Sequence, residues 1–188
     1  MRSSVDPQAD PPQSDRALVA RQLGRDPRAF HRVAVRCPFG APAVTEQQPY
    51  TVDGEPFPTT YYLTCPHLVA EVSRVEAAGG VERWSAATRE EPELAASLAA
   101  ADEEQRRIRR ELAGSAEERA DGGASLLFGV GGSRPPLHLG GGSLKCLHAH
   151  VAFALARPGY ALGERIAAEL EPLWPDHCCT PIQDSTVA

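Results

Sequence analysis

The chain has 188 residues and a formal net charge of −6, with 42% hydrophobic and 23% charged residues, which is ordinary for a globular protein. Its acidic balance argues against a general binder of nucleic acid. No apolar run approaches the roughly 20 residues that span a bilayer, and the polar, proline-rich N-terminus lacks the apolar core of a secretory signal. We therefore expect a cytoplasmic protein that does not contact a membrane.

The first half of the chain holds the expected strands. Apolar and polar residues alternate over 30–36, which is typical of a half-buried strand, and a second short strand is expected around 43–45. The β-branched and aromatic residues at 59–64 predict a third strand. Together these segments predict a small antiparallel sheet within about residues 30–64.

Helical patterns occupy much of the remaining chain, and glycine or proline pairs such as Gly79-Gly80 and Pro158-Gly159 end two of them. Within the longest pattern, the charged second half, 102–111, is expected to face solvent. The expected helices lie at 17–23, 67–78, 81–88, 92–112, 144–156 and 162–170.

These elements predict one α+β domain over residues 14–179, with disordered tails at 1–13 and 180–188. In this domain four or five helices pack with the small sheet. The C-terminal part is expected to be rich in helix.

The most reactive segment is 140–150, where a glycine run meets a predicted helix start. Lys145 is the only lysine of the chain, since 18 of its 19 basic residues are arginines. If Ser143 caps the helix, Cys146 lies in the first turn, where unpaired backbone N–H groups and the helix dipole favour a thiolate. Lys145 and Cys146 are therefore candidate catalytic residues.

Two histidines follow on the same expected helix. Cys146 and His150 are four residues apart, which places them on one helix face. His148 is expected to lie on another face, close to the apolar stripe. The alternative is that the cysteine and both histidines are buried side chains without a chemical role.

Further cysteines precede prolines at the ends of two predicted strands, in Cys37-Pro38 and Cys65-Pro66. If these strands are neighbours, both thiols could reach Cys146. Three cysteines and a histidine suit a tetrahedral zinc ion, whereas three thiolates alone suit an iron–sulfur cluster with one open iron. Whether Cys178 or Cys179 adds a ligand stays open. The expected metal ligands are Cys37, Cys65, Cys146, His150 and His148.

Arginines are concentrated near the N-terminus. Six of them between residues 14 and 36 give that segment a charge of +4, which leaves −10 for the remaining chain. Together with the glycine-rich approach to a helix N-terminus, they predict a pocket for a small anionic ligand or substrate. The alternative is a solvated surface in a chain that uses arginine almost everywhere. The candidate pocket residues are Arg21, Arg25, Arg36 and Ser143.

Several motifs occur together in a recognisable order. They are Arg21-Gln-Leu-Gly-Arg25, Arg36-Cys-Pro, Phe57-Pro-Thr-Thr-Tyr-Tyr-Leu-Thr-Cys-Pro66, Glu91-Pro-Glu-Leu94 and Lys145-Cys-Leu-His-Ala-His150. With them the chain resembles the bacterial family catalogued as domain of unknown function 501, over about residues 16 to 179. That family often has Cys-Pro-Cys-Gly where this chain has Phe39 in place of the second cysteine. The resemblance implies a small soluble bacterial protein and brings no activity with it.

Three functions follow from these features. The first is a metal-binding protein with a zinc or iron–sulfur centre beside the anion pocket, with or without catalysis. The second is a metal-free thiol enzyme in which Cys146 is the nucleophile and a histidine is the base. The third is a non-catalytic module that binds an acidic partner protein through its arginine segment. We expect the first, and nucleic acid is not an expected partner.

Overall fold

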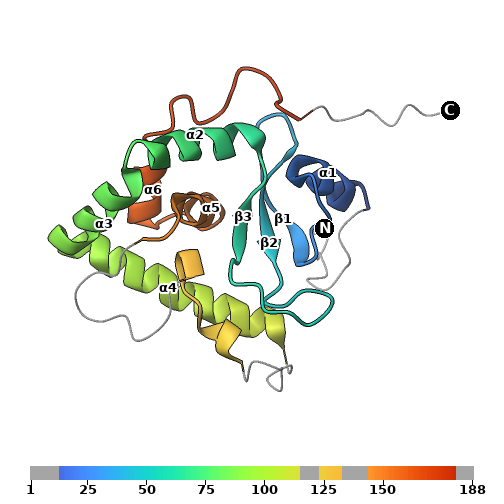
Figure 1. Cartoon of the computed structure of the whole chain (residues 1–188), viewed down its shortest axis with the longest axis horizontal. Helices are drawn as coiled ribbons and strands as arrows, with labels where there is room; N and C mark the ends of the chain where they lie inside the picture. Colours follow the sequence, from blue (N-terminus) through green and yellow to red (C-terminus); the bar gives the residue numbers. More distant parts are fainter. Residues whose placement is uncertain (1–12, 115–122, 133–143, 181–188) are drawn as a thin grey trace, which may run out of the picture.

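The computed structural model describes residues 13–114, 123–132 and 144–180. Within these ranges a three-stranded antiparallel sheet packs with six α-helices (Figure 1), which confirms the expected α+β fold. The α-helices are α1 (Gln13–Leu23), α2 (Pro66–Ala77), α3 (Gly80–Glu90), α4 (Pro92–Ala113), α5 (Leu147–Ala156) and α6 (Ala161–Ala167). The strands are β1 (Phe30–Arg36), β2 (Pro42–Gln47) and β3 (Tyr61–Leu63), and two short 3₁₀ turns are η1 (Ala124–Leu127) and η2 (Val130–Gly132).

The six described α-helices match the six helical patterns of the sequence, one or two more than were expected to pack with the sheet. Gly79, with a left-handed φ of 79°, separates α2 from α3, because glycine adopts that conformation without steric cost. Pro92 then begins α4 directly after α3. No helix of the described ranges is long and apolar enough to cross a membrane. The predicted tails fall almost wholly outside these ranges, although Gln13 already belongs to α1 and Thr180 is buried.

The sheet has the order β1-β2-β3, so β2 is its centre. Every residue of β2 is buried, and Val44 stands opposite both Val35 of β1 and Leu63 of β3. Since both neighbours run antiparallel to β2, β1 and β3 run in the same direction and end at the same end of the sheet. This arrangement decides where Cys37 and Cys65 lie.

The core is centred on α5, which lies between β3, α2 and α6 (Figure 1). Its residues Leu147, Val151, Ala152, Phe153 and Ala154 are buried, as expected for a largely apolar helix. Close approach of α6 depends on Gly163, where a Cβ atom would come within 2.6 Å of the His150 carbonyl oxygen. The interior of the domain is therefore built around one enclosed helix.

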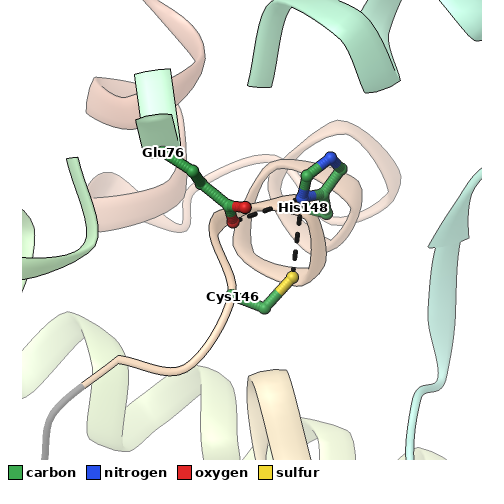
Figure 2. A group of neighbouring side chains, drawn as sticks. All are labelled: Glu76, Cys146 and His148. Atoms are coloured by element: carbon green, nitrogen blue, oxygen red, sulfur yellow. Dashed lines mark hydrogen bonds and ion pairs between the residues drawn. The ribbon is translucent and has the colours of Figure 1, made fainter. Parts of the chain in front are cut away.

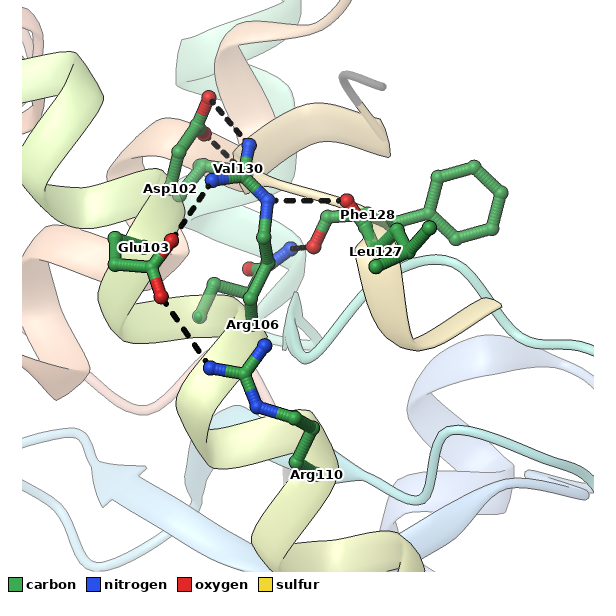
Figure 3. A network of polar contacts seen from close by, with 8 residues as sticks. Asp102, Glu103, Arg106, Arg110, Leu127, Phe128 and Val130 are labelled. Atoms are coloured by element: carbon green, nitrogen blue, oxygen red, sulfur yellow. Dashed lines mark hydrogen bonds and ion pairs between the residues drawn. The ribbon is translucent and has the colours of Figure 1, made fainter. Parts of the chain in front are cut away.

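The expectation that residues 102–111 of α4 face solvent was wrong for one face of the helix. Asp102, Gln105 and Arg109 are 0%, 2% and 0% exposed. Asp102 Oδ1 accepts a hydrogen bond of 2.7 Å from the Val130 N–H (Figure 3), and Arg109 donates to the carbonyl oxygens of Ser125 at 2.8 Å and Phe57 at 2.7 Å. A hydropathy pattern does not predict this burial, because these polar side chains are buried in order to hydrogen-bond backbone groups outside regular helices and strands.

The other side of α4 behaves as predicted. Glu103 is exposed and lies between Arg106 and Arg110, with 3.3 Å separations to both guanidinium groups (Figure 3). Such exposed ion pairs contribute little to stability. Adjacent arginines of α4 therefore have very different roles.

Replacing Arg109 by Met is expected to lower the free energy of unfolding by about 3 kcal/mol or more, because buried carbonyl groups lose their donors. The matched change Arg110→Met, on the exposed face, should cost less than about 0.5 kcal/mol. Chemical denaturation of both variants measures the difference. Equal costs would contradict the role assigned to the buried face.

His150 is a core residue rather than a site residue, with 1% exposure. Its Nδ1 lies 2.7 Å from the Tyr160 hydroxyl. Burial raises the pKa of Tyr160 well above its usual range, so the hydroxyl keeps its proton and donates to the imidazole. The same burial lowers the pKa of His150 to about 4.

This histidine makes the fold sensitive to acid. Because the unfolded chain binds a proton near pH 6.5 and the folded chain only near pH 4, stability is lost as the pH falls through that window, by about 2 kcal/mol between about pH 6.5 and 5. His150→Gln, which keeps an acceptor for Tyr160, should flatten this decline in denaturation experiments. The exposed His177→Gln is the control and should keep the wild-type decline. An unchanged slope in His150→Gln would refute the assignment.

Candidate functional site

The candidate site lies at the N-terminus of α5. The helix begins at Leu147, three residues later than expected, and Cys146 occupies the N-cap in an extended conformation. Its side chain does not cap the helix. Instead Glu76, from the last turn of α2, accepts a 2.6 Å hydrogen bond from the Leu147 N–H. A carboxylate is favoured there by the helix dipole, and Ser143, the expected cap, lies outside the described residues.

Three side chains converge at this helix end (Figure 2). Glu76 Oε1 lies 3.2 Å from His148 Nδ1, and Cys146 Sγ lies 3.6 Å from the same nitrogen. Each of the three residues is half-buried and offers a ligand atom within 4.8 Å of the others. Among the residues that the structure describes, no other group of three or more Cys, His, Asp or Glu side chains meets that spacing. Glu76, Cys146 and His148 are called the Cys-His-Glu cluster below.

The expected pairing of Cys146 with His150 was wrong, and His148 takes its place. The expectation applied helical spacing to Cys146, whose backbone is extended with a φ of −160°. Its thiol therefore leaves the chain in a direction that helix geometry does not describe. His150 points into the core, where it contacts Tyr160.

A single metal site of Cys37, Cys65 and Cys146 is not formed by the described residues. β1 and β3 do end at the same end of the sheet, as expected, but β2 lies between them. Neighbouring strands are about 4.8 Å apart, so the ends of β1 and β3 are separated by about twice that distance. Cys65 Sγ instead lies 3.4 Å from Cys179 Sγ, while Cys37 is buried in the turn after β1.

Most arginines of the N-terminal segment are paired with acidic side chains. Ion pairs join Arg16 to Asp26, Arg28 to Asp53, Arg32 to Glu46 and Arg36 to Asp15. Arg21 and Arg25 are exposed on and just after α1, and Lys145 is exposed beside Cys146. The expected anion pocket therefore has Arg36 engaged elsewhere.

A pocket of about 600 Å³ lies beside the cluster, and Cys146 and His148 belong to its wall. This volume is in the range of small-molecule sites. The other lining residues are Gln22, Leu23, Thr59, Tyr61, Tyr62, Leu63, Thr64, Pro66, Val69, Ala70, Gly131 and Ala149. These described residues include no Asp, Glu, Lys or Arg, so the wall is largely apolar apart from Cys146 and His148.

The pKa of His148 is raised by its neighbours in the cluster. Burial lowers its pKa, but hydrogen bonding and attraction from Cys146 and then Glu76 outweigh burial and raise the pKa to about 9. Its other ring nitrogen, Nε2, lies 3.2 Å from the Val69 carbonyl oxygen, which can only accept. In the metal-free protein an imidazolium is therefore the form that can donate from both nitrogens at once.

Glu76 is the member of the cluster that the sequence reasoning missed. One local signal marks it, because Glu76 lies in the last turn of α2, where the helix dipole disfavours an acidic side chain. An acid in that position needs a partner from outside its own helix. The N-terminus of α5 supplies this partner.

Comparisons with known proteins place the chain in a family. A search of the curated proteins and a search of the solved structures each found no match. The model of a family described as "Protein of unknown function (DUF501)" matches residues 33–168. That range holds Glu76, Cys146 and His148, whereas Cys179 lies outside it. Since the match covers more than half of the chain, the protein is a member of this family, as its motifs predicted.

Proposed function

We propose that Cys146, His148 and Glu76 bind one zinc ion whose fourth coordination position opens toward the pocket. The observation that carries this proposal is the convergence of three different ligand types on one point. Zinc–ligand bonds of about 2.3 Å to sulfur and 2.1 Å to nitrogen or oxygen, at tetrahedral angles, put sulfur and nitrogen about 3.6 Å apart and nitrogen and oxygen about 3.4 Å apart. The corresponding separations in the cluster are 3.6 and 3.2 Å.

The surroundings of the ligands support the same proposal. Zinc-binding histidines usually donate their second ring N–H to a carbonyl or carboxylate oxygen, which orients the ring. The Val69 carbonyl oxygen is in that position for His148 Nε2, with Ser73 Oγ 3.3 Å from the same nitrogen. The Leu147 N–H orients the Glu76 carboxylate in a similar way.

The ligand set favours zinc over an iron–sulfur centre. Cys146 brings the only thiol of the Cys-His-Glu cluster, and neither Cys37 nor Cys65 belongs to it. Three protein ligands with one open position are typical of catalytic zinc, which activates a bound water near neutral pH. With the adjoining pocket, this suggests hydrolysis of an uncharged, largely apolar substrate.

The purified protein is expected to contain about one zinc ion per chain by elemental mass spectrometry, because three side-chain ligands form a typical catalytic site. Cys146→Ala and His148→Ala should lose it. Glu76→Gln should bind zinc at least ~10-fold more weakly, because an amide replaces the anionic ligand. Cys37→Ala, which removes a cysteine outside the cluster, is the control and should retain the metal. Folded wild-type protein that stays zinc-free after equilibration with zinc would overturn the proposal.

A second candidate function is favoured by the same short distance between Cys146 Sγ and His148 Nδ1. In a metal-free protein the imidazolium of His148 would attract a thiolate, which is the nucleophilic form of cysteine. Both side chains line the pocket, and Glu76 orients the histidine. The proposed chemistry is then attack by the Cys146 sulfur on a carbonyl carbon of the ligand, in which the carbonyl π pair moves to the oxygen and His148 delivers its proton there.

Alkylation with iodoacetamide separates the two candidates. In the thiol enzyme, Cys146 should be the fastest-reacting cysteine near neutral pH, and His148→Gln should slow its labelling by about 10-fold or more, because the charge partner is lost. Zinc should then have no effect. If zinc binds the cluster, stoichiometric zinc should protect Cys146 while Cys178 labels as before. Mass spectrometry of the labelled peptides measures both rates.

A further inference from the structure

A pair of thiols lies apart from the Cys-His-Glu cluster. Cys65 Sγ and Cys179 Sγ are 3.4 Å apart, although 114 positions separate the two residues in the chain. Both cysteines are free thiols. Cys65 is 2% exposed at the N-cap of α2, whereas Cys179 is half-buried in the segment after α6.

We propose that Cys65 and Cys179 form a reversible disulfide by exchange with a small-molecule disulfide. The Cys179 thiolate attacks one sulfur of the small disulfide, and the other half leaves as a thiolate that takes up a proton. Cys65, as a thiolate, then attacks the Cys179 sulfur of this mixed disulfide and releases the second small thiol. The protein loses two protons and two electrons, and the small disulfide is reduced to two thiols.

The environment of each sulfur suggests the order of these steps. Burial raises the pKa of Cys65 to about 11, so this thiol stays protonated and is not expected to make the first attack. Cys179 is the more accessible of the two and is expected to react first. Cys178 is a poor competitor, because its Sγ donates to the Thr180 carbonyl oxygen at 2.9 Å and adjacent cysteines form strained disulfides.

The proposed disulfide would fasten the C-terminal segment to a wall of the pocket. Figure 1 shows this segment passing from α6 along α2 toward α1. Non-covalent contacts already hold it there, since His67 bonds to the Pro172 carbonyl oxygen at 2.8 Å and Gln22 to Thr180 Oγ1 at 3.2 Å. Thr64 and Pro66, on either side of Cys65, line the pocket. Oxidation would therefore turn a breakable contact beside the pocket into a covalent one.

The test uses the full-length reduced protein, incubated with oxidised glutathione and analysed by intact mass and peptide mapping. The expected product has lost two hydrogen atoms, contains a Cys65–Cys179 peptide pair and melts about 5 °C or more higher, because the cross-link restricts the unfolded chain. Dithiothreitol should restore the original mass and the original melting temperature.

Matched variants make the outcome specific. Cys179→Ser should abolish the cross-link, whereas Cys178→Ser should leave it intact. Cys146→Ser should also form the cross-link, so that loss of the proposed zinc or thiol function does not affect this result. Oxidation that stops at a glutathione adduct, or that joins Cys65 to Cys178, would overturn the proposal.

Discussion

The N-terminus of α5 is the constraint on which the candidate site depends. A largely apolar helix is stable only when other elements enclose it, and enclosure removes water from its first unpaired N–H groups. Glu76 meets this need by accepting from the Leu147 N–H. The same oxygen also faces His148, and Cys146 lies at the cap itself. The Glu76 carboxylate therefore both accepts from the N-terminus of α5 and belongs to the candidate site.

Buried polar contacts also shape the pocket wall next to Cys146. The buried face of α4 holds the segment 123–132 through its backbone, with Asp102 on Val130 and Arg109 on Ser125. Gly131 follows directly, with a φ of 70°, and both lines the pocket and lies against the His150 ring. A Cβ atom there would come 3.3 Å from His150 Nε2. The buried polar face of α4 thus positions Gly131 in the pocket wall.

In the proposed zinc site, the metal would take the place of a proton of the Cys-His-Glu cluster. Without metal, Cys146 and Glu76 stabilise the protonated form of His148 and raise its pKa to about 9. A zinc ion at the same point would replace this proton and neutralise both anionic ligands. Most guanidinium groups of the arginine segment are paired with acidic side chains outside the cluster within the described residues.

Much of the local structure could be predicted from the sequence because its signals act over few residues. The alternation at 30–36 matches β1 to the residue, Pro66 and Pro92 begin α2 and α4, and the motifs identified the family. The choice of Cys146 as a candidate site residue rested on the same kind of local signal and stays a prediction. Only the tertiary structure decided which side chains lie beside Cys146, namely His148 in place of His150 and Glu76 from a helix far away in the sequence. It also decided that Asp102 and Arg109 are buried. These outcomes depend on which element covers each face, and β2, placed between β1 and β3, kept Cys37 from joining Cys65. Periodicity reports how a segment folds, whereas contacts between segments are set by packing over the whole chain.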